Sequence, residues 1–194
     1  MTPTRKLQEL SPTEVAEARA ALESARDRVI DATAGLSEAQ WNYRPASGGW
    51  SVAGVLEHAV LVQELVLGPI AQAMAGVPES SSLTTEVIDE LVKAKIVDRS
   101  RKFPSPEPTH PTGRWTPADA LQRLSANTGR FIERLETTPG LRNRRLPSPP
   151  LKAISCGEHE LMDGYQWILA TALHTDRHCL QILEVKAEPG FPAS

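Results

Sequence analysis

The fold is decided by residues 161–186, which read LMDGYQWILATALHTDRHCLQILEVK. Apolar side chains recur in this stretch at spacings of three, four and seven residues, the pattern of one face of an α-helix. These side chains are Leu161, Tyr165, Ile168, Ala172, Cys179, Ile182 and Val185. We expect a helix from about Glu158 to Lys186, opened by a capping box of Ser155 and Glu158. Because an isolated amphipathic helix is marginally stable in water, it must pack against partners of the same kind.

The rest of the chain supplies three such partners. Helical periodicity predicts them over residues 11–35, 51–77 and 116–138. Each begins with a residue typical of a helix N-cap, namely Ser11, Ser51 and Thr116. Shorter helical segments are expected over residues 37–45 and 86–97, and residues 76–115 are too long to form a tight helix hairpin.

Four amphipathic helices bury their apolar faces best against one another, so the predicted fold is an all-α four-helix bundle. It has a long crossover between the second and third helices, and short extra helices. The length of 194 residues fits one domain, residues 1–194, with its core over about residues 11–187.

The composition excludes several classes of protein. The 21 Lys and Arg against 24 Asp and Glu give a net charge of −3, which leaves no basic footprint for nucleic acid. No apolar run reaches the roughly 18 residues of a membrane-spanning helix, so no membrane partner is expected. The N-terminus lacks the apolar segment of a secretory signal, which favours the cytoplasm. The short basic cluster of Arg142, Arg144 and Arg145 is interpreted as a solvated loop.

The chain has two cysteines, Cys156 and Cys179, too few for a disulfide framework or a zinc ribbon. Both are expected to be reduced thiols in the cytoplasm. Cys179 falls on the apolar face of a helix and is interpreted as a core residue rather than a nucleophile.

Three of the five histidines form the strongest chemical pattern in the sequence. His174 and His178 are four residues apart, so on a helix their rings stack on one side and can chelate one metal ion. His58 has apolar neighbours at helical spacing, so it faces the interior of the bundle. Three imidazoles from two helices would leave coordination positions open, as catalytic rather than structural sites do. The alternative is that all three are core histidines without a ligand. His110 and His159 are expected to face solvent, and either is an alternative ligand.

The chain resembles the DinB/YfiT-like superfamily of four-helix-bundle metal-dependent proteins. The resemblance covers about Ser11 to Val185 and rests on short segments in a fixed order. They are residues 36–45 (LSEAQWNYRP), residues 49–52 (GWSV), His58 shortly after, residues 110–115 (HPTGRW) leading into residues 118–121 (ADAL), and His174 with His178.

The resemblance implies a divalent transition metal, whether zinc, nickel, iron or manganese, bound by His58, His174 and His178. It also implies a homodimer, and a low-molecular-weight thiol as a further cofactor, because relatives include thiol-dependent S-transferases. Asp176 and Gln181 are candidates to accept a hydrogen bond from a ligating imidazole. Asp176 stands two residues from His174, however, and so is expected to point away.

The leading hypothesis is therefore a metal-dependent enzyme acting on a small molecule, either as a thiol-dependent S-transferase or as a metal-assisted hydrolase. The alternatives are a non-catalytic metal-binding protein and a structural dimeric bundle. The sequence assigns no general acid or base.

Overall fold

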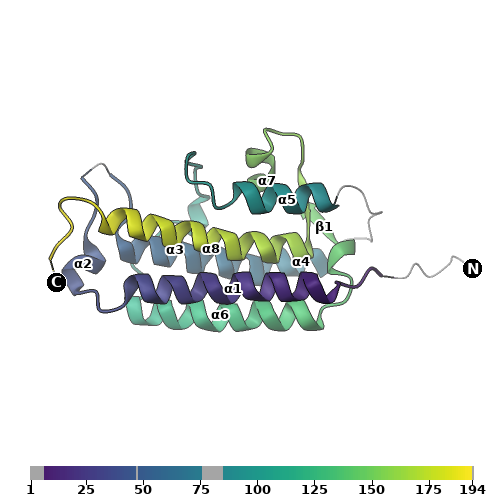
Figure 1. The fold of residues 1–194 in the computed structure, drawn as a ribbon, viewed down its shortest axis with the longest axis horizontal. Coiled ribbons are helices and arrows are strands. Elements are labelled where there is room, and N and C mark those ends of the chain that lie inside the picture. Colours follow the sequence, from purple (N-terminus) through teal and green to yellow (C-terminus); the bar gives the residue numbers. More distant parts are fainter. Residues whose placement is uncertain (1–6, 47, 76–84, 194) are drawn as a thin grey trace, which may run out of the picture.

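Four long helices form the bundle in the computed structural model, which describes residues 7–46, 48–75 and 85–193 (Figure 1). They are α1 (Pro12–Thr33), α3 (Val52–Leu65), α6 (Pro117–Thr137) and α8 (Gly164–Lys186). Helices α1 and α3 each pack against both α6 and α8, so α1 and α3 stand diagonally opposite each other. Helices α1 and α8 run in one direction and α3 and α6 in the other (Figure 1). The predicted all-α four-helix bundle is confirmed.

Shorter elements complete the part of the chain that the structure describes. They are α2 (Glu38–Asn42), the π-helical turn η1 (Val66–Ile70), α4 (Ala71–Ala75), α5 (Thr85–Lys95), the 3₁₀ turns η2 (Glu107–Thr109) and η3 (Leu141–Asn143), β1 (Arg145–Pro147), α7 (Pro149–Ile154) and β2 (Leu161–Asp163). Strands β1 and β2 pair antiparallel, with Leu146 opposite Met162. Helix α5 packs against α8 and α7, beside the bundle (Figure 1).

Side-chain caps open the helices largely where the sequence predicts them. Ser11 accepts a hydrogen bond from the Glu14 backbone N–H, and the Glu14 carboxylate accepts one from the Ser11 N–H, which completes a capping box. Ser51 and Thr116 cap α3 and α6 in the same way with their hydroxyl oxygens. Each such cap contributes about 1 kcal/mol to helix stability. The predicted end of the second helix, beyond residue 75, and the cap of α5 lie outside the described residues.

The predicted start of the last helix is wrong. Helix α8 begins at Gly164, and its capping box is made by Asp163 and Gln166 rather than by Ser155 and Glu158. Residues 148–163 instead form α7 and strand β2, since the Ser148 hydroxyl caps α7 through the Leu151 N–H. Leu161 therefore lies in an extended strand, 45% exposed, and not on the inner face of a helix.

Arg142 is buried, not solvated as its proline-rich surroundings suggested. It is 5% exposed, and its guanidinium contacts the carboxylates of Glu14 at 2.5 Å, Asp89 at 2.6 Å and Asp163 at 3.1 Å. The guanidinium carbon also lies 4.0 Å from the centroid of the Tyr165 ring. This single side chain thus joins the first turns of α1 and α8 to α5. Burial raises the pKa of Asp163 to about 6, against the opposing effect of Arg142.

Replacing Arg142 by Met should destabilise the fold by about 3–5 kcal/mol, because it leaves three carboxylates together without their cation. Urea denaturation followed by circular dichroism measures this change. The matched control is Arg123→Met, which breaks the more exposed pair with Glu64 and should cost at most about 1 kcal/mol. Equal urea midpoints for Arg142→Met and the wild type would contradict the assigned role of Arg142.

Helix α3 continues through η1 into α4 without a break. Pro69, which has no backbone N–H, falls within the π-helical turn, and the guanidinium of Arg134 donates a hydrogen bond to the Leu67 carbonyl there at 3.2 Å. By length and composition alone, the span Val52–Ala75 would suffice to cross a membrane, with a mean hydropathy of 1.3. About 59% of the 18-residue window that meets the criterion is buried inside the protein, however, and a core helix of a bundle meets the same criterion.

The apolar core falls into two clusters along the bundle axis. On α8, the buried members of one cluster end at Ala172, and those of the other begin at Cys179. His174 and His178 lie at this junction, where Thr175 is also buried. On α8, His174, Thr175 and His178 therefore lie between two apolar regions.

Candidate metal centre

His58, His174 and His178 meet between α3 and α8. One nitrogen from each ring lies within 4.8 Å of the other two. The ring centroid of His58 lies 5.3 Å from that of His174 and 4.7 Å from that of His178. The centroids of the two α8 rings are 4.4 Å apart. His58 and His178 are buried, whereas His174 is half-buried. The structure thus brings together all three residues that the sequence singled out.

Hydrogen bonds fix which nitrogen of two of these rings faces the cluster. His58 Nδ1 lies 2.8 Å from the carbonyl oxygen of Thr109, which can only accept, so Nδ1 carries the proton. His178 Nδ1 lies 2.9 Å from Gln181 Oε1, and Arg99 also donates to this oxygen at 3.4 Å. Because arginine only donates, the amide oxygen must face both groups. In each ring Nε2 therefore keeps its lone pair.

The three imidazoles fit a transition-metal ion. His174 Nε2 lies 3.1 Å from His178 Nε2. Two nitrogens bound to one metal at about 2.0–2.1 Å stand roughly 2.8–3.0 Å apart in octahedral geometry and roughly 3.3–3.4 Å apart in tetrahedral geometry, so the observed separation falls between the two. His174 Nδ1, by contrast, is buried without a hydrogen-bond partner among the residues that the structure describes. Ligating histidines characteristically donate their other N–H to an oxygen, and His58 and His178 both do so here.

Burial keeps these rings uncharged, as metal ligation requires. Loss of solvation lowers the pKa of His58, and it lowers the pKa of His174 to about 3, helped by the neighbouring His58. The pKa of His178 falls well below its usual value, also through burial first and His174 second. At neutral pH the cluster thus presents three neutral imidazoles.

The crossover between α5 and α6 lies against this centre. Thr109 belongs to its η2 turn, and Arg99 precedes that turn. Arg177, on α8 between the two histidines, donates to the backbone carbonyls of Asp98 and Arg101. The Trp50 ring, just before α3, contacts His58 with a centroid distance of 4.7 Å.

Comparison with known proteins agrees with this fold. The model of the DinB superfamily matches residues 21–182. The chain belongs to the DinB superfamily. Among solved structures it is similar to YfiT from Bacillus subtilis, with 16% sequence identity, a TM-score of 0.62, and coverage of 97% of this chain and 94% of that one. That structure is described as a probable metal-dependent hydrolase with an unusual four-helix bundle topology. None of the curated proteins matches the chain.

The two candidate supporting residues on α8 of this DinB-superfamily chain behave differently. Gln181 contacts His178, as described above. Asp176 points away from the cluster, as expected, and forms an ion pair with Arg28 of α1. Cys179 is buried in the core, also as expected.

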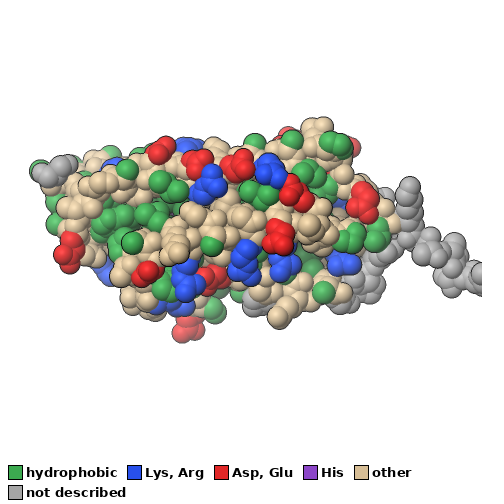
Figure 2. Space-filling model, turned by 90° about the horizontal axis from the view of Figure 1, so that it is seen from below, with side chains coloured by type: hydrophobic (Ala, Val, Ile, Leu, Met, Phe, Trp, Pro, Cys, Tyr) green, Lys and Arg blue, Asp and Glu red, His purple; other side chains and the backbone are tan. Residues whose placement is uncertain are grey.

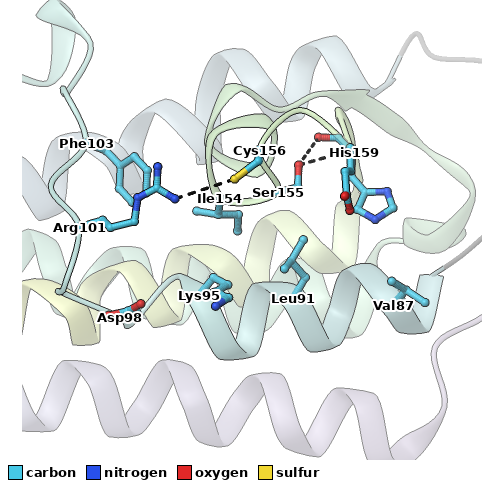
Figure 3. A pocket seen from close by; sticks show the side chains of 11 residues that line it. Val87, Leu91, Lys95, Asp98, Arg101, Phe103, Ile154, Ser155, Cys156 and His159 are labelled. Atoms are coloured by element: carbon cyan, nitrogen blue, oxygen red, sulfur yellow. Dashed lines mark hydrogen bonds between the residues drawn. The ribbon is translucent and has the colours of Figure 1, made fainter.

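The remaining histidines lie outside the cluster. His110 is exposed, as expected, and its Nε2 donates a hydrogen bond to the Ser105 carbonyl oxygen, which can only accept. His159 is partly buried and lines a cavity of about 470 Å³ between α5 and the turn after α7 (Figure 3). This cavity also holds the exposed thiol of Cys156, beside the Arg101 guanidinium at 4.0 Å. None of the three clustered histidines lines it.

The outer surface shows no concentration of one charge on the face seen in Figure 2, where basic and acidic side chains intermingle among the described residues. Arg19, for example, lies between Glu23 of its own helix and Glu136 of α6. This mixture is what the near-balanced composition leads one to expect.

Sequence reasoning missed the residues that hold the crossover against the centre, above all Glu57 and Thr109. Both are buried, with 4% and 1% of their surfaces exposed. One signal for Glu57 is present in the sequence. Residues 52–62 are apolar around almost the whole helix, so a carboxylate among them must be buried and requires donors. Thr109 acts through its backbone carbonyl, and no pattern of side chains reveals such a contact.

The stability of the metal-free protein should fall as the pH is lowered from 7 to 5. The clustered histidines have lowered pKa values when folded, against about 6.5 when unfolded, so the unfolded chain binds more protons below pH 6.5. Each such histidine then costs up to about 1.4 kcal/mol per pH unit.

Urea titrations at pH 7, 6 and 5 in the presence of a chelator measure this slope. His178→Ala should make this slope shallower than that of the wild type. A His178→Ala slope as steep as that of the wild type would refute the assignment.

Proposed function

We propose that this protein is a metal-dependent hydrolase that binds one divalent transition-metal ion through His58, His174 and His178. The observation that carries the proposal is the convergence of three neutral imidazoles from two helices, two of them with Nδ1 fixed by an oxygen acceptor. The description of YfiT, a structure with the same fold, as a probable metal-dependent hydrolase supports it.

Three protein ligands leave at least one coordination position for another molecule, which distinguishes catalytic from structural sites. A metal ion held there would lower the pKa of a water molecule toward neutrality and polarise a substrate carbonyl. The contribution of the chain is to orient the ligating imidazoles. Thr109 and Gln181 hold His58 and His178 in the tautomer that turns Nε2 to the common centre, and burial keeps the rings uncharged.

The thiol-dependent S-transferase stays a second form of the same proposal. An open coordination position that accepts water also accepts a low-molecular-weight thiol, whose pKa a metal lowers too. The two forms differ in their requirements, since the transferase turns over only when the thiol is supplied. We give priority to hydrolysis because it needs no second substrate.

Further expectations stay proposals of the same kind. We expect a small-molecule substrate, a cytoplasmic location and no nucleic-acid or membrane partner. We also expect a homodimer. Gel filtration with light scattering would measure the mass of the assembly directly.

Metal content gives the first test. The purified, tag-free protein should contain about one transition-metal ion per chain by plasma mass spectrometry. His58→Ala, His174→Ala and His178→Ala should each weaken metal binding by at least about 100-fold, because even a group that merely supports a ligand contributes about 10–100-fold. His110→Ala is the matched control and should retain the metal. An unchanged metal content in all three ligand variants would refute the site.

Activity gives the second test. Hydrolysis of a panel of activated esters and amides should fall at least about 100-fold in kcat/KM on chelation and return with added zinc, nickel, iron(II) or manganese. Each reaction is run with and without glutathione, mycothiol or bacillithiol. Metal-dependent turnover that appears only with a thiol would select the S-transferase, and a metal-loaded protein with neither activity would leave a non-catalytic metal-binding protein.

A further inference from the structure

A buried carboxylate lies beside the candidate ligands. Glu57 directly precedes His58 on α3 and is 4% exposed. Burying a carboxylate is costly unless hydrogen bonds or a cation compensate for its lost hydration. The groups that donate hydrogen bonds to Glu57 therefore indicate which segment of the chain it holds in place.

These donors come from one short segment of the crossover. Glu57 Oε1 accepts from the Thr112 backbone N–H at 2.9 Å and from the Arg114 N–H at 3.4 Å, and Oε2 accepts from the Gly113 N–H at 2.8 Å. The Thr112 hydroxyl and the Arg114 Nε add contacts to Oε1 at 3.4 and 3.2 Å. Since both oxygens are occupied, Glu57 is placed to hold a loop rather than to act on a substrate.

The same loop supplies the acceptor for His58. Thr109 lies three residues before Thr112, and its carbonyl oxygen accepts from His58 Nδ1. Between these two points Pro111 crosses α3 closely, because a Cβ on Gly54 would stand 3.5 Å from its ring. Gly113 has a φ of +74°, a conformation that glycine adopts without strain and that turns its N–H toward Glu57. Two consecutive residues of α3 thus bind the loop at both ends: His58 contacts Thr109, and Glu57 contacts residues 112–114.

We infer that Glu57 is a positioning residue for the metal centre: by holding the backbone of residues 112–114, it keeps the Thr109 carbonyl on His58 and so presents His58 Nε2 to the metal. This inference rests on the proposed function for its metal-binding consequence. The orientation of His58 itself follows from the metal-free geometry alone. Gln181 fills the corresponding role for His178, within α8.

The test replaces Glu57 by Gln, which keeps the size but turns an NH₂ group toward backbone N–H donors. The matched control is Glu64→Gln, the same change on the same helix at a partly exposed ion pair with Arg123. In the metal-free protein, the ¹⁵N shifts of the imidazoles report the tautomer of each ring. We expect His58 to be Nδ1–H in the wild type and in Glu64→Gln, and a mixture of tautomers in Glu57→Gln, with His178 unchanged.

Zinc affinity, measured by competition with a chromophoric chelator, gives the second readout. Glu57→Gln should bind zinc about 10-fold more weakly, as other supporting groups of metal ligands do. Glu64→Gln should match the wild type within about twofold. Should Glu57→Gln fail to fold, Glu57→Asp keeps the charge, withdraws the oxygens by one methylene and should show the same changes in smaller measure.

The outcomes separate the two ideas. A wild-type protein that binds no zinc defeats the proposed function, while the tautomer of His58 still tests the role of Glu57. A wild type that binds zinc, with Glu57→Gln or Glu57→Asp equal to it in both tautomer and affinity, overturns the inference. A loss of folding stability alone, without either change, assigns Glu57 to the fold and also overturns it.

Discussion

Three imidazole rings share one space between α3 and α8, and the surrounding structure depends on how their nitrogens are satisfied. A buried polar atom without a partner costs about 1–3 kcal/mol, so each ring needs an oxygen acceptor, a neighbouring nitrogen or a metal. His58 finds a backbone carbonyl, His178 finds an amide oxygen, and His174 Nδ1 finds neither. The crossover supplies the acceptor for His58, and both apolar clusters on α8 stop short of the histidines.

The crossover is therefore more than a connection between α5 and α6. Its residues supply the acceptor for His58, and Arg99 supports the amide that orients His178. Two charged residues next to the candidate ligands fasten it to the bundle, Glu57 on α3 and Arg177 on α8. A bundle with α1 and α3 on a diagonal leaves α3 and α8 adjacent and antiparallel, so that ligands and supports lie on the same two helices.

A second polar cluster lies at the start of α8. Arg142 joins three carboxylates from α1, α5 and the N-cap of α8, away from the histidine cluster. Asp163 is both a partner of Arg142 and the N-cap of α8, so this charge cluster lies at the first turn of the helix that carries two of the candidate ligands.

The sequence by itself determined the bundle and the three histidines. Helical periodicity, caps such as Ser11 with Glu14, and the four-residue spacing of His174 and His178 are local properties, readable without the third dimension. Only the tertiary structure decided the rest. The burial of Arg142 and the pairing of β1 with β2 depend on contacts between residues distant in sequence. The apolar surroundings of Glu57 in the sequence indicate that its carboxylate is buried, but the partners of Glu57 and the contact of Thr109 are backbone N–H and carbonyl groups, which no pattern of side chains reveals.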